Sequence, residues 1–158
     1  MNFTNADKRM STAGPFWVVV ADASRAVIYS RERRRSPLVQ SLVVENEASR
    51  KKAGELLADK GGRSFDSHGE GRHTMAKEET GPKRQAALAF AKEIAGFISQ
   101  ATQVGNCKEF GVIAAPKFLG LLRTEMSSGH SVMPSFEIDK NVVTHDAADI
   151  SDLIERSQ

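Results

Sequence analysis

The sequence predicts an α/β domain in which helices pack on a mixed sheet of about five strands. Two observations predict it. Three short apolar segments, at residues 17–21, 26–30 and 38–45, follow one another with turn residues between them, which indicates an antiparallel meander. From residue 83 onward, apolar positions at helical spacing alternate with short apolar runs of strand length. A meander followed by such alternation is typical of a mixed α/β sheet.

The meander is justified by its residue types. Residues 17–21 are apolar and mostly β-branched, which favours a strand. Asp22 and Ser24 carry side chains that bond to nearby backbone N–H groups, so residues 22–25 are interpreted as a self-capped hairpin turn. After the second strand, a Ser-Pro pair interrupts the chain before the imperfect alternation of residues 38–45.

A long amphipathic helix is the clearest element of the chain. Between Lys83 and Val104, apolar side chains recur at helical spacing. Their spacing also predicts that Phe90, Phe97 and Phe118 are core residues. Pro82 suits the first helical turn, and Gly105 suits the end. Residues 47–59 predict a shorter helix that a central glycine weakens.

The last third continues the alternation. Residues 110–115 predict a strand that a proline stops, and residues 117–127 predict the helix that follows. Residues 132–138 predict another strand, at a sheet edge or with a bulge because Pro134 lacks an N–H. Residues 146–156 carry apolar side chains on one face and predict a closing helix.

The bulk composition bounds the kind of protein. A chain of 158 residues predicts one domain, which we assign to residues 16–158, after a polar tail at residues 1–15 expected to be disordered. The longest apolar run near the start is far shorter than the roughly 20 residues of a membrane span. A single cysteine, Cys107, excludes an internal disulfide and favours the cytoplasm. A net charge of +2 is too small to indicate nucleic-acid binding by itself.

The segment Gly61–His73 is the strongest functional candidate. It is rich in glycine, arginine and histidine, and it belongs to a polar stretch before the long helix. Long loops between packed elements are usually functional or disordered. If the segment binds RNA or phosphate, the expected contacts are two arginine side chains, backbone N–H groups near two glycines, and two histidines. These residues are Arg63, Arg72, Gly69, Gly71, His68 and His73.

Two alternative interpretations of this segment are weaker. A metal site would use Asp66, His68 and His73, but the spacing is not that of a compact zinc site. A hydrolytic site would use Asp66 or Glu70 with a histidine, and two carboxylates in one loop are common by chance. We therefore predict no metal, no cofactor and no catalytic residue, and leave a small hydrolase as an alternative.

A basic run forms the second candidate. Residues 31–35 contain four arginines, and Arg33, Arg34 and Arg35 are adjacent. Such a run is usually a solvated face, but clustered cations also suit RNA phosphates. No aromatic residue is interleaved with it, so the sequence does not indicate base stacking.

Four segments together resemble the bacterial host attachment protein family. They occur in order along nearly the whole chain: residues 17–29, 62–73, 114–123 and 137–140. The family is grouped with relatives of the eukaryotic class-one release factor. The resemblance implies a ribonuclease-H-like fold of the kind found in the release-factor middle domain, with a glycine-rich loop before its long helix.

The resemblance also implies a limit on function. In release factors this loop carries Gly-Gly-Gln, whereas here the corresponding segment is Gly69-Glu-Gly-Arg-His73, with Arg72 and His73 at the place of the glutamine. We therefore expect a non-catalytic module that binds RNA or the ribosome in the cytoplasm. The alternative is an attachment or colonisation factor that acts through protein partners.

Overall fold

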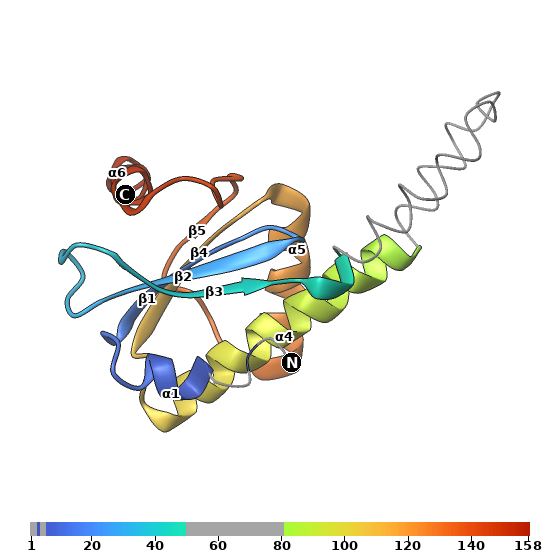
Figure 1. Cartoon of the computed structure of the whole chain (residues 1–158), viewed down its shortest axis with the longest axis horizontal. Coiled ribbons are helices and arrows are strands. Elements are labelled where there is room, and N and C mark those ends of the chain that lie inside the picture. The colour runs from blue at the N-terminus through green and yellow to red at the C-terminus, as the bar shows by residue number, and fades with distance from the viewer. Residues whose placement is uncertain (1–2, 4–5, 50–80) are drawn as a thin grey trace.

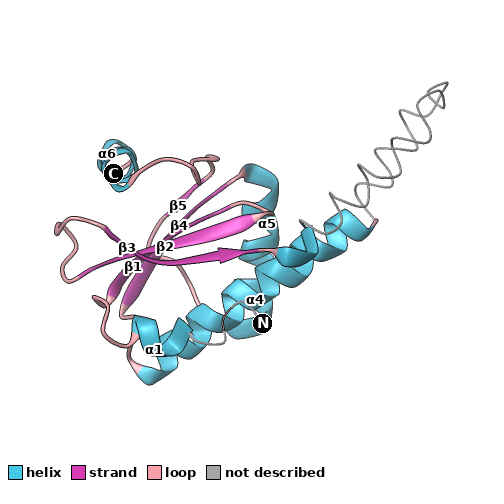
Figure 2. Ribbon diagram, in the orientation of Figure 1, coloured by secondary structure: helices cyan, strands magenta, loops and turns pink. Residues whose placement is uncertain are grey.

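The protein is a five-stranded mixed sheet with helices on both faces (Figure 1). The computed structural model describes residue 3 and residues 6–49 and 81–158. The sheet order is β3-β2-β1-β4-β5. Helices α1 (Ala6–Met10), α4 (Pro82–Val104) and α5 (Pro116–Thr124) pack on one face, and α6 (Ala147–Arg156) covers the other (Figure 2). The predicted α/β class is confirmed.

The predicted meander is also confirmed. Strands β1 (Phe16–Ala21), β2 (Arg25–Arg31) and β3 (Val39–Glu45) pair antiparallel in sequence order. On the other side of β1, β4 (Glu109–Ala114) runs parallel to it, and β5 (Glu137–Ile138) runs parallel to β4. Strand β1 therefore lies at the centre of the sheet, where both of its faces are buried.

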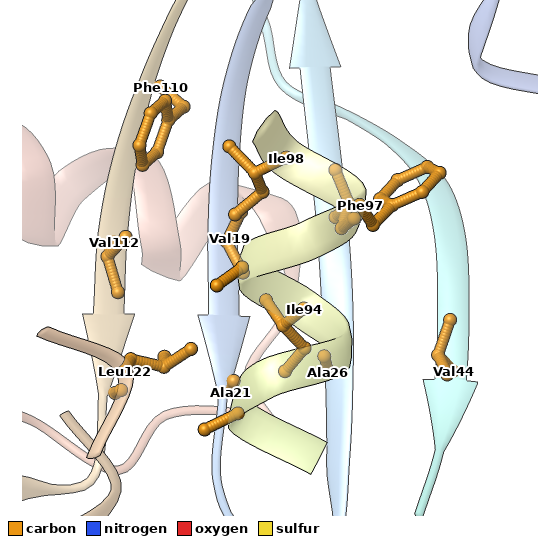
Figure 3. Packing of buried hydrophobic residues seen from close by; sticks show 14 of the residues in the cluster. Val19, Ala21, Ala26, Val44, Ile94, Phe97, Ile98, Phe110, Val112 and Leu122 are labelled. Carbon is orange, nitrogen blue, oxygen red and sulfur yellow. The ribbon is translucent and has the colours of Figure 1, made fainter. Parts of the chain in front are cut away.

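The alternation of β1 explains why its sequence is apolar throughout. Trp17 and Val19 belong to the core beneath α4, while Val18 and Val20 belong to the core beneath α6. On the α4 side, Ile94 and neighbouring helix residues lie against the sheet (Figure 3). Two cores on opposite faces are the arrangement expected of a central strand in an α/β fold.

The long helix has the predicted ends. Pro82 occupies its first turn. Gly105 ends it with φ of 88°, a left-handed conformation that glycine adopts readily, and its N–H donates to the carbonyl of Ala101. The predicted helix at residues 47–59 is described only at residues 47–49, which are helical; the rest lies outside the described residues.

The segment after β4 differs from the prediction. Helix α5 continues directly into a π-helical stretch, η1 (Glu125–His130), and Ser131 ends it with φ of 54°. The strand predicted at residues 132–138 is only Glu137–Ile138. Pro134 cannot donate a ladder hydrogen bond, so regular pairing with β4 starts after it.

The described residues before β1 pack against the rest of the domain. Met10 is 1% exposed in the core beneath α4, and the Phe3 ring stacks on Phe97 with centroids 4.9 Å apart. At Gly14 a Cβ atom would collide with the backbone of Arg31, so the chain entering β1 passes close against β2. Packing of these side chains orders residues whose own sequence pattern is too short to predict a helix.

No helix in residues 6–49 and 81–158 is both long enough and apolar enough to span a membrane.

Candidate nucleic-acid interface

The residues predicted from the Gly61–His73 segment all lie outside the described residues. They are Arg63, His68, Gly69, Gly71, Arg72 and His73, together with Asp66 and Glu70 of the alternative interpretations. The structure does describe the two stretches of chain that flank residues 50–80, and it describes the arginine run. These parts lie at different ends of the sheet.

Two terms locate these parts. Strands β1, β3, β4 and β5 run in the same direction, and β2 runs against them. We use "amino edge" for the end of the sheet where β1 begins, marked by Phe16, Arg31 and Glu109, which are partners across three strands. We use "carboxyl edge" for the end where β1 and β4 stop, at Ala21 and Ala114. In Figure 1 the amino edge is on the left and the carboxyl edge is on the right.

At the carboxyl edge, the hairpin turn is closed by its own side chain. The Asp22 carboxylate accepts hydrogen bonds through Oδ1 from the Ser24 backbone N–H at 2.8 Å, from the Ser24 hydroxyl at 2.7 Å and from the Arg25 N–H at 3.0 Å. This confirms the self-capped turn interpreted from the sequence. The carboxylate is thus engaged in holding the turn.

Asn46 ties this turn to the chain on both sides of residues 50–80. Its side chain is 5% exposed and donates to the carbonyls of Ala23, at 2.9 Å, and Ala86, at 3.2 Å. Its backbone N–H donates to the Ser24 carbonyl at 2.8 Å. One buried amide therefore joins the end of β3, the β1–β2 turn and the first turns of α4. The sequence offered only an asparagine after a strand, a position that turn residues commonly occupy.

At the amino edge, the arginine run forms the turn between β2 and β3. The Ser36 N–H donates to the Arg33 carbonyl at 3.1 Å, which closes the turn. Arg33, Arg34 and Arg35 are all exposed. Among residues 6–49 and 81–158, Arg33 and Arg35 have no ion-pair partner. Their charges are therefore available to an anion from solvent.

Arg34 fixes this turn to β4. Its Nη2 lies 2.6 Å from Oε1 of Glu109, yet the Arg34 side chain is still 72% exposed. Because Phe16 is the strand partner of Glu109, Arg34 reaches from the β2–β3 turn past the start of β1 to β4. The ion pair therefore leaves most of the Arg34 side chain exposed.

Arg31 differs from the three arginines that follow it. Its Nε is buried and has no hydrogen-bond partner in the described part of the chain. Burial lowers the pKa of its guanidinium, and the nearby Glu109 carboxylate acts in the opposite direction. Arg31 is thus partly buried in the amino edge, whereas Arg33 and Arg35 expose their charges to solvent.

The structure adds an aromatic ring and a lysine that sequence reasoning missed. The Lys108 ammonium lies over the Phe16 ring, 5.9 Å from its centroid, which is within cation–π range. Phe16 is the first residue of β1, and Lys108 immediately precedes β4. The parallel pairing of these strands brings the two together beside the arginine turn. Residues so far apart in sequence gave no local signal of this cluster.

The sequence predicts RNA contacts both in the arginine run and in the Gly61–His73 segment, and the structure describes the run and the residues that flank 50–80. Arg33–Arg35 lie at the amino edge. Asn46 and Gly81, which flank residues 50–80, lie at the carboxyl edge. The two ends of the sheet are about 17 Å apart, which is the length of the six-residue strand β1.

Two observations concern metal ligands and the single thiol. No group of three or more His, Cys, Asp or Glu side chains in residues 6–49 and 81–158 is placed to hold a metal ion. Burial raises the pKa of the Cys107 thiol to about 12, so this thiol stays protonated and a poor nucleophile at neutral pH.

One protein family matches the part of the sequence that forms the sheet. The sequence model of the family described as "Protein required for attachment to host cells" matches residues 17–154. No curated protein matches the chain. The matched region includes β1 from its second residue, β2 to β5, α4 and α5, and most of α6, whereas α1 and Phe16 lie before it.

Proposed function

This chain belongs to the host attachment family, and we propose that it is a non-catalytic RNA-binding member that acts on structured RNA or the ribosome. The observation that carries the proposal is the arginine turn at the amino edge. Arg33 and Arg35 are exposed and without an ion-pair partner in the described part of the chain, on a turn that the Arg34–Glu109 ion pair holds in place.

A fixed turn suits phosphate binding for an energetic reason. Guanidinium groups bind phosphate bidentately and strongly. Ordering a flexible loop on binding costs conformational entropy, and a turn already held by a hydrogen bond and an ion pair avoids part of that cost. Binding led by phosphate contacts is also expected to weaken steeply as salt concentration rises.

The segment Gly61–His73 enters the proposal as a second contact, on the strength of its sequence. Arg63 and Arg72 would hold phosphate, and His68 and His73 would contact RNA beside the glycine backbone. We also propose that the fold is ribonuclease-H-like and related to the release-factor middle domain. A meander with β2 antiparallel, followed by two strands parallel to β1, supports that relation.

Under this proposal, the protein affects attachment to host cells indirectly. An RNA-binding protein in the cytoplasm would influence attachment through the synthesis of other proteins. Cell fractionation tests this location. A pool found wholly at the cell surface would contradict it and would favour direct attachment through protein partners.

Sedimentation with ribosomes tests the proposed function. The wild-type protein is expected in the ribosomal pellet at low salt and in the supernatant at high salt. An Arg33→Ala/Arg35→Ala variant and an Arg63→Ala/Arg72→Ala variant are each expected to sediment less. A Lys92→Ala/Lys140→Ala variant removes the same charge from exposed positions on α4 and beyond β5, and should sediment like wild type. If all four proteins stay in the supernatant at low salt, ribosome binding is refuted.

A further inference from the structure

The Phe16 ring has an unusual position for a phenylalanine in a central strand. It is half-buried, and neither of the two hydrophobic cores formed by the described residues includes it. It shares a sheet face with Val18 and Val20, which are packed in the core beneath α6. A phenylalanine usually contributes a large apolar area to a core, and here the ring is left at the rim of one.

Charged groups surround this ring on the neighbouring strands. Arg31 on β2 and Glu109 on β4 are its strand partners, and directly opposed residues point to the same face of a sheet. The Lys108 ammonium lies over the ring, and Arg34 reaches Glu109 beside it. The ring thus sits among cations, with one carboxylate already paired.

From this arrangement we propose that the amino edge is a binding site for single-stranded RNA, in which Phe16 stacks on a base and Arg33 and Arg35 hold the adjacent phosphates. The inference rests on the proposed function, which it deepens by naming the form of RNA and the stacking residue. Aromatic rings beside backbone-binding cations are the usual arrangement for single strands. Every base offers a face to stack on, so binding is expected to tolerate many sequences.

The arrangement favours a single strand over a duplex. In a duplex the bases are stacked on one another and their faces are hidden, so one ring at a sheet edge can reach only phosphates and sugars. In a single strand a base can turn out of the stack onto the ring. The Lys108 ammonium covers the ring in the free protein and would be displaced toward the phosphates as the base binds.

Fluorescence anisotropy with a labelled oligouridine and an RNA duplex of the same length tests the inference. Phe16→Leu keeps an apolar strand residue but removes the aromatic face. It is expected to weaken oligouridine binding about 5- to 150-fold, the range for loss of one base stack. Duplex binding is expected to stay at the wild-type level. Phe16→Trp keeps an aromatic face and is expected to retain oligouridine binding.

The outcomes separate this inference from the proposed function. If wild type binds RNA but Phe16→Leu and Phe16→Trp both bind oligouridine as wild type does, the stacking site is refuted and the arginine surface stands. If Phe16→Leu weakens duplex and single strand equally, stacking is refuted as well. If wild type binds neither RNA at low salt, the proposed function fails and this inference fails with it. Should Phe16→Leu not fold by circular dichroism, the Phe16→Trp comparison decides: loss of oligouridine binding in folded Phe16→Trp refutes stacking.

Discussion

The two ends of the sheet use their polar side chains in opposite ways. At the carboxyl edge, the side chains of Asp22 and Asn46 form hydrogen bonds with the protein's own backbone. At the amino edge, Arg33 and Arg35 make no ion pair within the described residues, and only Arg34 is fixed. Both ends carry residues that a sequence search for function would select.

The difference shows how to tell structural polar residues from candidate ligand contacts. A buried polar group needs its partners to avoid a desolvation cost, so its bonds are mostly explained by folding. An exposed cation on a fixed turn has no such explanation in the fold. We therefore expect changes at the carboxyl edge to alter stability, and changes at the amino edge to alter binding.

The largest expected effect concerns Cys107, whose reactivity tests whether the core at the amino edge is closed to solvent. Cys107 precedes β4, and burial raises the pKa of its thiol from 9.0 to about 12. At pH 8 iodoacetamide should therefore alkylate the folded protein far more slowly than the urea-unfolded chain, because a much smaller fraction of the buried thiol is thiolate. Rapid alkylation of the folded protein would contradict the burial of Cys107, and the positions of the arginines on this edge would then not support a binding site.

The same thiol gives a pH dependence of stability. The unfolded chain loses the Cys107 proton near pH 9, whereas the folded protein holds it until about pH 12. The stabilising contribution is therefore complete below pH 9 and is lost as pH rises through this window. Urea titrations above pH 9 should show a shallower fall in the free energy of unfolding for Cys107→Ala than for wild type.

The next effect concerns Asn46. Asn46→Ala leaves two carbonyls without their partner in a buried position, so it should lower the free energy of unfolding by about 2–4 kcal/mol. Urea denaturation measures the loss. Gln40→Ala removes an exposed amide from β3, the strand that Asn46 follows, and should change stability by less than about 0.5 kcal/mol. Equal losses from the two variants would contradict the structural role of Asn46.

A smaller loss is expected at Asp22. Asp22→Ala removes the acceptor of three hydrogen bonds in a partly exposed turn and should cost about 1–2 kcal/mol. Asp22→Asn keeps an acceptor oxygen and should recover most of that stability in the same denaturation assay. RNA binding by both variants should equal that of wild type; a selective loss of binding would place function at the carboxyl edge.

The smallest effect on stability is expected at Glu109. Glu109→Gln breaks an exposed ion pair and should cost less than about 1 kcal/mol. It also frees Arg34 and removes a carboxylate that repels phosphate, so oligouridine affinity should rise about 2- to 5-fold by anisotropy. A fall in affinity would show that the ion pair is needed to present the arginines.

Local patterns predicted the strands and the long helix because their causes are local. The apolar runs of β1 and β2 and the helical spacing of α4, between its proline and Gly105, are visible in the sequence itself. The short α1 depends instead on Met10 entering a core made by distant residues. The π-helical stretch η1, which the sequence analysis did not predict, ends at His130, whose ring lies close against Gly96 of the distant α4.

The site was predicted only in part, for the same reason. The arginine run is contiguous, so composition alone revealed it. Phe16 and Lys108 come together through the parallel pairing of β1 with β4, and neither stands near an arginine in the sequence. Asn46 gains its role from contacts with the β1–β2 turn and α4. Long-range pairing of strands and helices is information that single-residue patterns do not contain.

The salt dependence of oligouridine binding tests the central claim most directly. For single strands, log K falls with log salt with a slope of about −0.7 per phosphate contacted. If Arg33 and Arg35 each hold a phosphate, the Arg33→Ala/Arg35→Ala variant should show a slope shallower than wild type by about 1.4. The Lys92→Ala/Lys140→Ala variant should keep the wild-type slope. Identical slopes for all three proteins would contradict the assignment of RNA binding to the amino edge.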